Sequence, residues 1–543
     1  MFVSCDIMAE DVKRTFRTPH RSKGAIPVKM DTRFVTILEK IRQNASERPD
    51  RLMMIESAGE TKQSITWGQL DDYSDRLAYW MDSRLKTKTP IIVYGHKDPM
   101  MIVCFLACVK SGRAYCPIDI NVPVSRTAAI VNEVKPEIIL TTEPLDIQAS
   151  GTTVDKEQIL QIVSAETNRI SPEKAVKPDD VFYIIFTSGS TGVPKGVQIT
   201  RDCLDHFIQW AITLGNGVAD EKAYVFLNQA PFSFDLSVMD LFLCLYTGGT
   251  LWALPKPVQN DMKQLYRSLG ESDANVWVST PSFADVCLAD PVFSSELMPN
   301  LTVFLFCGEI LTNRTVERLF KRFPNAKVVN TYGPTESTCA VTEVTVTEEI
   351  NRSVTPLPVG RPKPGTWIRI VGENGQILPD GEHGEIVIVG DSVSVGYWNN
   401  EEKNKLSFGM TTENGTQYRF YRTGDEGYLS DEMLYYGGRM DLQVKLHGYR
   451  IELGDIENNL LKIDGIEQAV VIPTYRDGKV SSLVAGLVSS LPVSDEKAEV
   501  AKIKEALKKE LPEYMIPKKI RFLSDIPRTN NGKIDRKAVG EIL

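Results

Sequence analysis

Short apolar segments alternate with segments of helical periodicity along much of the chain. Beginning at Phe34, apolar side chains recur every three or four residues, which predicts a helix. The hydroxyl of Thr66 is suited to cap the start of a second helix. Apolar runs of strand length follow at residues 91–94, 112–120 and 137–141, with helical segments between them. Regular alternation of strands and helices predicts parallel sheets covered by helices. The expected fold class is therefore α/β.

The pattern changes in the last third of the chain. From Pro356, short strands punctuated by glycine are expected at residues 368–371, 384–389 and 396–398, which predicts a small β-barrel-like subdomain. Further on, an amphipathic helix is predicted by an apolar stripe made of Val500, Ile503, Leu507 and Leu511. We therefore expect residues 30–440 to form a large N-terminal domain of two βα-layered subdomains plus the β subdomain. A small α+β C-terminal domain should follow at 441–543.

Composition narrows the classes of function. A chain of 543 residues is long enough to form two or more hydrophobic cores. Its formal net charge of -9 argues against binding to nucleic acid or to anionic membranes. The longest apolar run, residues 100–109, is about half of a membrane span. Nine cysteines without a Cys-x-x-Cys pair predict neither a zinc site nor a disulfide framework, which suits the cytoplasm. Residues 1–29 are basic and predict a disordered extension.

One segment combines a buried strand with a phosphate-binding loop. Residues 181–186 are continuously apolar and aromatic, as in a strand that is buried on both faces. Glycines, hydroxyls and one lysine follow, and they can surround an anion with N–H and O–H donors: Thr187, Ser188, Gly189, Ser190, Thr191, Gly192 and Lys195. Lys195 follows a proline, and neither Ser nor Thr comes after it, so this is not a Walker loop. Without its context, the segment could equally be a mobile surface loop.

Three further places carry candidate chemistry. Asp235 lies among apolar residues, where an unpaired carboxylate is costly, although a helix cap or a surface position would also explain it. A strand ends in residues that could contact a purine, phosphates and Mg²⁺: Asn330, Thr331, Tyr332, Gly333, Thr335 and Glu336. Asp425 lies in a turn, where its carboxylate could accept both hydroxyls of a ribose.

The order Thr-Ser-Gly-Ser-Thr-Gly-x-Pro-Lys-Gly after the buried strand resembles the phosphate loop of the adenylate-forming superfamily of acyl-CoA synthetases, adenylation domains and luciferases. From about Asp31 onward the chain is similar to one branch, the D-alanine–D-alanyl carrier protein ligases. The motifs that carry this similarity are Ser-Phe-Asp-Leu-Ser-Val-Met-Asp at 233–240, Phe-Leu-Phe-Cys-Gly-Glu at 304–309, Asn-Thr-Tyr-Gly-Pro-Thr-Glu at 330–336 and Gln-Val-Lys-Leu-His-Gly-Tyr-Arg at 443–450. Cys339 departs from the branch, whose members tend to have valine there.

The resemblance implies a two-step reaction with ATP and Mg²⁺. D-Alanine attacks the α-phosphate to give D-alanyl-AMP, and the phosphopantetheine thiol of a D-alanyl carrier protein then takes the D-alanyl group, for D-alanylation of lipoteichoic acid. Catalysis would rest on Lys533, which would bridge carboxylate and phosphate, on Arg439 beside the nucleotide, and on Lys195 with its loop around the pyrophosphate. Glu336 would hold the metal. The C-terminal domain would be mobile, with its hinge at Asp441.

The resemblance also implies an amino-acid pocket. Asp235 would pair with the substrate ammonium and Lys533 with its carboxylate, inside walls formed by Leu236, Met239, Cys307, Thr331 and Cys339. We expect Cys307 to exclude the methyl group of L-alanine. Three alternatives remain open at this point: an adenylation enzyme of the peptide-synthetase type for another small amino acid, an acyl-CoA synthetase, and a nucleotide sensor without catalysis. An acyl-CoA synthetase would have no use for Asp235, and a sensor would not require the two lysines and Glu336 together.

Overall fold

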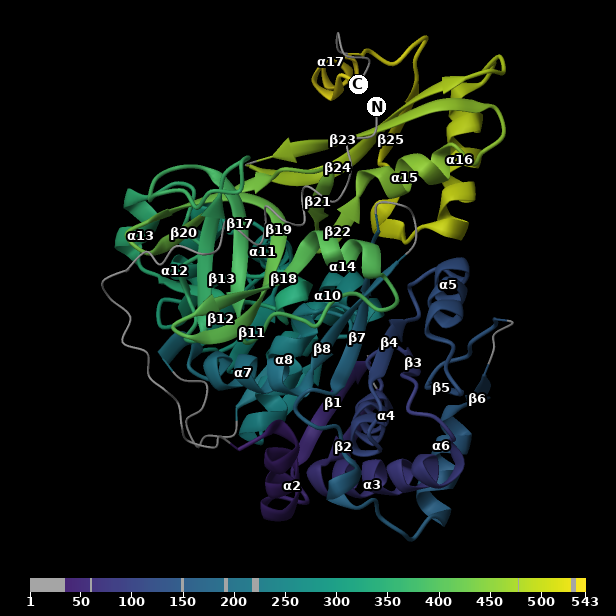
Figure 1. Ribbon diagram of the computed structural model, residues 1–543, viewed down its shortest axis with the longest axis vertical. Coiled ribbons are helices and arrows are strands. Elements are labelled where there is room, and N and C mark those ends of the chain that lie inside the picture. Colours follow the sequence, from purple (N-terminus) through teal and green to yellow (C-terminus); the bar gives the residue numbers. More distant parts are fainter. Residues whose placement is uncertain are drawn as a thin grey trace.

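The computed structural model describes residues 35–58, 61–147, 151–189, 194–216, 224–476, 478–528 and 534–543 (Figure 1). The expectation for residues 1–29 and the site assignments of Ser190, Thr191, Gly192 and Lys533 lie outside these ranges. Within them the chain is an α/β protein with two large sheets, a smaller antiparallel sheet and a C-terminal α+β part. The expected fold class is confirmed.

The first large sheet has six strands in the order β6-β5-β3-β4-β7-β8. Neighbouring strands are parallel except for β8, which runs antiparallel to β7. Its elements are β3 (Ile91–Gly95), α4 (Pro99–Lys110), β4 (Tyr115–Asp119), α5 (Val124–Val134), β5 (Ile138–Thr141), β6 (Thr152–Val154), α6 (Lys156–Ala165), β7 (Val181–Thr187), β8 (Lys195–Thr200) and α7 (Arg201–Ala211). The strand expected at 112–120 begins later, at Tyr115, because Gly112 turns the chain after α4 with a φ of 74°.

The second large sheet has nine strands in the order β15-β14-β13-β12-β11-β9-β10-β1-β2, with antiparallel strands at its two edges. Its elements are α2 (Ile37–Glu47), β1 (Leu52–Ala58), β2 (Thr61–Thr66), α3 (Trp67–Arg84), β9 (Val225–Asn228), α8 (Leu236–Thr247), β10 (Thr250–Ala253), α9 (Lys256–Asn260), α10 (Met262–Glu271), β11 (Val276–Ser279), α11 (Pro281–Leu288), β12 (Val303–Phe306), α12 (Asn313–Arg322), β13 (Lys327–Tyr332), β14 (Thr342–Val346), α13 (Glu348–Ser353) and β15 (Arg361–Pro362). Thr66 caps α3 as expected, by accepting a hydrogen bond from the Gln69 N–H.

Helix α4 joins the two large sheets into one core. All of its residues are buried, and it contacts β3 and β4 of the first sheet as well as β1 and β2 of the second. A helix that is apolar on every side must be covered on every side, which explains its place between the sheets. The carboxyl ends of β7, β12 and β13 therefore have fixed positions relative to one another.

The third sheet is antiparallel and has five strands. Its elements are β16 (Thr366–Val371), β17 (Gly384–Gly390), α14 (Glu401–Ser407), β18 (Phe408–Glu413), β19 (Thr416–Ser430) and β20 (Met433–Arg439). The predictions at 368–371 and 384–389 are confirmed, whereas residues 396–398 form no strand. There Tyr397 makes a single bridge to Val197, because its ring turns inward and its hydroxyl reaches Glu336.

The C-terminal part has its own apolar core. It consists of the hairpin β21 (Gln443–Leu446) and β22 (Tyr449–Glu452), then α15 (Leu453–Leu460), β23 (Ile466–Arg476), β24 (Lys479–Ser489), α16 (Glu496–Glu510), β25 (Lys519–Phe522) and α17 (Arg536–Ile542). The predicted apolar stripe buries Ile503 and Leu507 in α16 and Leu511 just after it.

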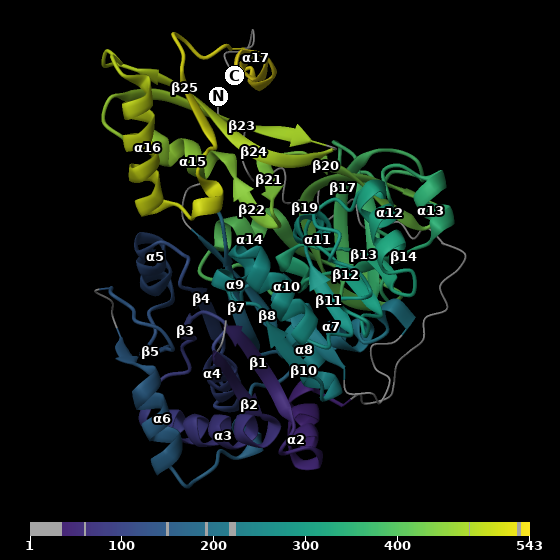
Figure 2. The same cartoon turned by 180° about the vertical axis from the view of Figure 1, so that it is seen from behind.

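Both views show the C-terminal part at one end of the molecule, with the hairpin directed toward the large sheets (Figures 1 and 2). Helix α16 faces α5, where the Ser125 hydroxyl donates a hydrogen bond to the Lys509 carbonyl at 2.9 Å. Nearby, Arg126 pairs with Asp455 at 3.2 Å. These contacts keep the hairpin over the carboxyl ends of the strands.

Candidate active site

A cavity of about 1170 Å³ lies where the C-terminal part meets the large sheets. Its walls include Thr187 and Ser188 at the end of β7, Phe234 before α8, Thr335 after β13, and Arg450 on the hairpin. In open α/β sheets, ligands bind beyond the carboxyl ends of the strands, so this is the expected position for a site. The sequence motifs converge here although they lie far apart in the chain.

The described part of the phosphate loop is in contact with the hairpin. Ser188 Oγ donates to the Arg450 carbonyl at 2.6 Å, and Lys195 Nζ lies 3.4 Å from Glu452 Oε1. Burial lowers the pKa of Lys195, and the charge of Arg450 lowers it further. Among the residues that the structure describes, no partner is found for the buried hydroxyl of Thr187. Gly189, the last described residue before the gap, is buried. The described residues of the loop therefore present to an anion a hydroxyl that has no partner among them and a buried lysine.

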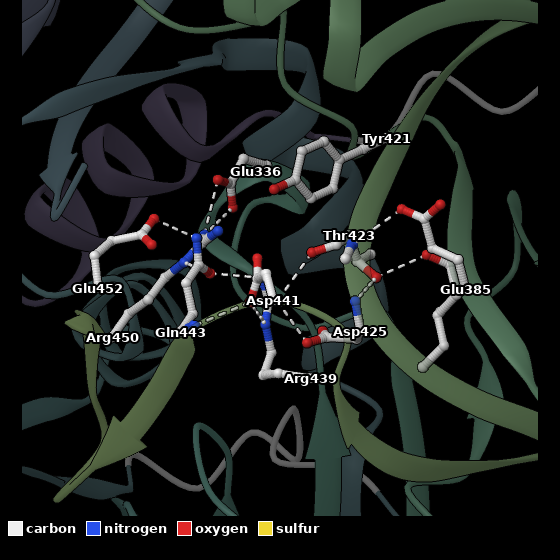
Figure 3. A network of polar contacts seen from close by, with 12 residues as sticks. Glu336, Glu385, Tyr421, Thr423, Asp425, Arg439, Asp441, Gln443, Arg450 and Glu452 are labelled. Atoms are coloured by element: carbon white, nitrogen blue, oxygen red, sulfur yellow. Dashed lines mark hydrogen bonds and ion pairs between the residues drawn. The ribbon is translucent and has the colours of Figure 1, made fainter. Parts of the chain in front are cut away.

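Glu336 is the most enclosed carboxylate of the site. It lies in the short 3₁₀ helix Thr335–Ser337 and is 0% exposed. Arg450 Nη1 donates to both of its oxygens, at 2.8 and 2.9 Å (Figure 3). The Tyr397 hydroxyl donates to Oε1 at 2.7 Å. Burial alone would raise the pKa of Glu336, but the charges of Arg450 and Lys195 outweigh it and lower that pKa to about 2. Glu336 is therefore an anion at every physiological pH.

A magnesium ion fits this chemistry only through a single protein carboxylate. No group of three or more His, Cys, Asp and Glu side chains that could hold a metal occurs in the described residues. Mg²⁺ commonly takes one or two carboxylates and completes its coordination with phosphate oxygens and water, so Glu336 suffices as its ligand. In the arrangement seen here, both Glu336 oxygens are bound to Arg450.

Asp235 is a second carboxylate of the site, half-buried and with different partners from Glu336. It occupies the N-cap position of α8, yet within the described residues its side chain makes no capping hydrogen bond, which removes the helix-cap explanation. The Thr335 hydroxyl donates to its Oδ2 at 2.5 Å. Burial raises the pKa of Asp235, and the positive charges of Lys445 and Arg450 only partly offset this effect. The carboxylate is therefore under-compensated and suited to bind a cation.

The expected pocket walls lie near Asp235. Leu236 and Met239 are buried in the first turns of α8, next to Asp235 in the chain. Cys307 follows β12, and its thiol contacts the Cys339 carbonyl at 3.8 Å. The charge of Asp235 influences the pKa of both of these thiols, so both are near it. On the next strand, the Thr331 hydroxyl donates to the Phe306 carbonyl at 2.8 Å and fixes that wall.

The expected nucleotide residues also meet. Strand pairing sets Arg439 of β20 opposite Asp425 of β19, and its Nη1 donates to Asp425 Oδ1 at 2.6 Å. The Tyr332 hydroxyl donates to Asp425 Oδ2 at 2.5 Å. Asn330 donates to the Pro358 carbonyl at 2.8 Å, while its own side-chain oxygen has no partner among the described residues. Asp425 therefore interacts with both the ring expected at the adenine and the cation expected beside the nucleotide.

Two glycines in this region are required by close packing. A Cβ on Gly333 would lie 2.6 Å from the Ala340 Cα atom, so this turn position depends on packing whatever its role toward a nucleotide. Gly448 has a φ of 82° at the hairpin tip, and a Cβ there would lie 2.3 Å from Thr280 Cγ2. Its N–H also donates to Glu309 Oε1 at 2.8 Å, which fixes the tip of the hairpin beside β12.

Sequence reasoning missed the residues that connect the site to the hairpin. Gln443 and Arg450 lie in the motif at 443–450 and Glu452 lies two residues beyond it, but no role was predicted for any of them. The signal that could have found them is the density of charge in this short segment, since a charged residue beside an apolar one must find a partner once it is buried. Tyr397 was missed because its segment was expected to be a strand.

Comparison with protein families identifies two regions of the chain. Residues 41–398 match the family described as "AMP-binding enzyme", and residues 455–533 match "AMP-binding enzyme C-terminal domain". Similar proteins include the D-alanine–D-alanyl carrier protein ligases of Bacillus cytotoxicus and Bacillus thuringiensis (strain Al Hakam). Each is 45% identical over 505 residues, which covers 92% of this chain and 98% of the relative.

Solved structures show the same architecture. PA1221, a peptide-synthetase protein containing adenylation and carrier domains, has a TM-score of 0.78 at 27% identity and covers 94% of this chain and 84% of its own. The o-succinylbenzoate CoA synthetase of Bacillus subtilis has a TM-score of 0.77 at 21% identity, covers 92% of this chain and 98% of its own, and so shows the fold alone. The site geometry and the two family matches agree, and the chain belongs to the family of AMP-binding enzymes.

Proposed function

We propose that this chain is an AMP-forming ligase that activates D-alanine as D-alanyl-AMP and transfers it to the phosphopantetheine thiol of a D-alanyl carrier protein, for the D-alanylation of lipoteichoic acid. The observation that carries the proposal is the under-compensated, half-buried carboxylate of Asp235, which is followed in α8 by the buried side chains of Leu236 and Met239. Relatives named for this reaction, 45% identical over nearly their whole length, support the choice of substrate and partner.

The first half-reaction joins two anions, the amino-acid carboxylate and the α-phosphate of ATP. It therefore depends on cations and aligned donors more than on a base. We assign the bridging cation to Lys533 and the pyrophosphate to Lys195 and its loop. Arg439, Tyr332 and Asp425 would hold the nucleoside, since Arg439 and Tyr332 both donate hydrogen bonds to Asp425.

Mg²⁺ would be held by Glu336 and would neutralise the charge of the phosphates. The residues of this chain then have to orient the substrate and to exclude water. Asp235 and Thr335 would bind the ammonium, and the buried walls beside α8 would keep the carboxylate facing the nucleotide. We place the reaction in the cytoplasm because it consumes ATP. No helix in the described parts of the chain is long and apolar enough to cross a membrane.

ATP–pyrophosphate exchange tests the function directly. Exchange should require D-alanine, and the protein should then load D-alanine onto a carrier protein bearing phosphopantetheine, with release of AMP. Glycine and L-alanine serve as matched controls. Exchange supported better by another small amino acid would favour an adenylation enzyme of the peptide-synthetase type. Exchange with no amino acid tested would contradict the proposal.

The variant Lys533→Ala should be measured in the same assay, because it should separate the two half-reactions, adenylation and transfer to the carrier. Only the first half has to neutralise the meeting of carboxylate and phosphate, and removal of such a charge costs about 3–4 kcal/mol of transition-state stabilisation. The variant should lose exchange yet still transfer D-alanine from supplied D-alanyl-AMP. An equal loss in both halves would show that Lys533 serves a different role.

The raised pKa of Asp235 predicts a pH dependence for D-alanine binding. An ammonium binds the ionised carboxylate, so KM for D-alanine should rise about tenfold per pH unit once the pH falls below that raised pKa. Asp235→Asn should raise KM by roughly 10- to 150-fold and remove the pH dependence. A KM that follows the same pH profile in both proteins would contradict this assignment.

Thermal unfolding provides the control for Asp235→Asn. A carboxyl group whose pKa is raised by folding weakens the fold at pH values above its unfolded pKa, because its ionised form is then the one that is disfavoured. The asparagine variant should therefore have an equal or higher Tm at pH 7. A higher KM at an undiminished Tm separates loss of binding from loss of folding.

Cys307 is our candidate for selection of the D enantiomer. Its thiol, held against the Cys339 carbonyl, lies where one wall could occupy the volume of the L-methyl group. Cys307→Ala should raise kcat/KM for L-alanine by about 10- to 200-fold, with little change for D-alanine. The matched control is Cys287→Ala, a buried thiol in α11. An unchanged D/L ratio in a folded Cys307→Ala protein would show that this thiol only fills space.

We also propose that the C-terminal part, residues 441–543, rotates about Asp441 between the two half-reactions. Asp441 lies between β20 and β21, and its half-exposed carboxylate pairs with Arg439 Nε at 2.9 Å. Asp441→Pro fixes φ and should leave one half-reaction near normal while impairing the other. Asp441→Ala removes the same ion pair without fixing φ and is the control. Full activity of Asp441→Pro in both halves would place the hinge elsewhere.

A further inference from the structure

Two of the buried thiols lie against each other near Asp235. Cys307 follows β12 and is 4% exposed, and Cys339, which follows the short helix Thr335–Ser337, is 2% exposed. Both thiols are free, and Cys307 Sγ lies 3.8 Å from the Cys339 carbonyl oxygen. A hydrogen bond between the two side chains lowers the pKa of Cys307 and, together with burial, raises the pKa of Cys339. The two sulfur atoms therefore lie within hydrogen-bonding distance of each other.

Backbone contacts fix the position of Cys339. The residue before it, Thr338, has a φ of 80°, which a β-branched residue rarely adopts. Such strain persists only where the neighbouring contacts determine the conformation. Here the Thr338 carbonyl accepts a hydrogen bond from the Tyr183 hydroxyl at 3.2 Å, and the Thr338 hydroxyl donates to the Ser392 carbonyl at 2.8 Å. The thiol of Cys339 is therefore presented to Cys307 by a constrained segment.

A second pair of cysteines serves as a structural comparison. Cys104 and Cys108 lie four residues apart on α4, where both are 0% exposed between the two large sheets. Burial raises the pKa of both thiols, which keeps them protonated and unreactive. Cys307 differs because its pKa is lowered and because a second thiol contacts it beside the proposed amino-acid pocket. A thiol of lowered pKa next to a second thiol is typical of redox-sensitive cysteines.

We propose that Cys307 and Cys339 form an oxidation site for hydrogen peroxide, and that the disulfide between them blocks binding of the amino acid. The proposal rests on the proposed function, which places these two side chains in the walls of the D-alanine pocket. A path that admits D-alanine also admits peroxide, which is the smaller molecule. Position 339 is where the chain departs from the ligases that it resembles, which tend to have valine there. Valine cannot form the disulfide, so the sensitivity is a property of this chain.

The reaction consumes one peroxide molecule for each pair of thiols. The Cys307 thiolate attacks one peroxide oxygen, the O–O bond breaks, and a sulfenic acid and hydroxide form. The Cys339 sulfur then attacks the Cys307 sulfur, the S–O bond breaks, and the departing oxygen leaves as water with the proton of the Cys339 thiol. The hydroxide from the first step takes the proton that Cys307 lost on ionisation. The two thiols together lose two electrons, and peroxide is reduced to two waters.

The disulfide changes the pocket because a covalent S–S bond is much shorter than a hydrogen-bonded contact between two thiols. Its formation draws the segment after β12 toward the segment before β14. A pocket shaped for one methyl group has little room for such a shift, so the oxidised protein should bind D-alanine weakly. A bound amino acid, in turn, should cover the thiols and slow their oxidation.

Peroxide treatment of the native protein tests the proposal. ATP–pyrophosphate exchange should fall about 10-fold or more, the effect of one misplaced pocket contact, and dithiothreitol should restore it. Dithiothreitol does not reverse methionine sulfoxide or sulfinic acid, so recovery identifies a disulfide. D-Alanine present during the treatment should slow the loss. Mass spectrometry without reduction should find Cys307 linked to Cys339, with Cys104 and Cys108 still reduced in the same sample. An inactivated protein that lacks this link, or that dithiothreitol does not restore, would overturn the proposal.

Two substitutions of Cys339 test the role of each thiol, with every variant compared with its own untreated activity. Cys339→Val removes both the second thiol and its hydrogen bond, so Cys307 should react severalfold more slowly. Cys339→Ser keeps a hydroxyl donor but cannot form the disulfide, so it should accumulate a sulfenic acid on Cys307 that dimedone traps. The matched control is Cys287→Ala, a buried thiol in α11, which should lose exchange as the native protein does. If Cys339→Val loses exchange as fast as the native protein and recovers with dithiothreitol, another thiol is responsible and the proposal is wrong.

The mass-spectrometric measurement separates this proposal from the proposed function, because it needs no amino-acid substrate. If the link between Cys307 and Cys339 forms and blocks exchange that another small amino acid supports, the substrate assignment is wrong and the oxidation site stands. If exchange requires D-alanine and the link does not form, the function stands and the oxidation site is wrong. A link that forms without any loss of exchange also contradicts the proposal, since the disulfide then leaves the pocket open.

Discussion

The arrangement of this site depends on the need to keep one buried anion paired. Glu336 has no exposed surface, and the last turn after β13 fixes its position between the two large sheets. A carboxylate in that place must always have a cation beside it, because an ionised group is strongly disfavoured in an apolar interior. In the arrangement seen here the cation comes from the C-terminal part, so the electrostatics of a buried site connect two parts of the chain.

This constraint gives the hairpin a reason for its composition. Its tip has to be narrow, which Gly448 permits, and its strands have to carry both an arginine for Glu336 and a carboxylate for Lys195. Gln443 lies between Arg439 and Arg450 and orients both, because both guanidinium groups donate to its Oε1. Two cations beside each other are tolerated because each also binds an acid, Asp425 in one case and Glu336 in the other.

Local chemistry made much of this predictable from sequence. The strand before the phosphate loop is a continuous apolar run. Equally local patterns predicted the helix cap at Thr66, the apolar stripe of α16, and the strands at 368–371 and 384–389. The pairing of Arg450 with Glu336 joins residues 114 positions apart in the chain, and no local pattern encodes which acid a given arginine meets. The same limit explains Tyr397: its segment has the composition of a strand, but the ring is used to reach Glu336.

The two acids of the site, Glu336 buried and Asp235 half-buried, differ in the charges that surround them. Both lose solvation, yet the pKa of Glu336 is lowered and that of Asp235 is raised, because Glu336 has a guanidinium in direct contact whereas Asp235 has a threonine hydroxyl and only more distant charges. A carboxylate that the protein has already paired gains little from a further cation. One that is left under-compensated gains the full interaction when an ammonium arrives. The contrast therefore favours Asp235 over Glu336 as the carboxylate that would bind the ammonium of a small substrate.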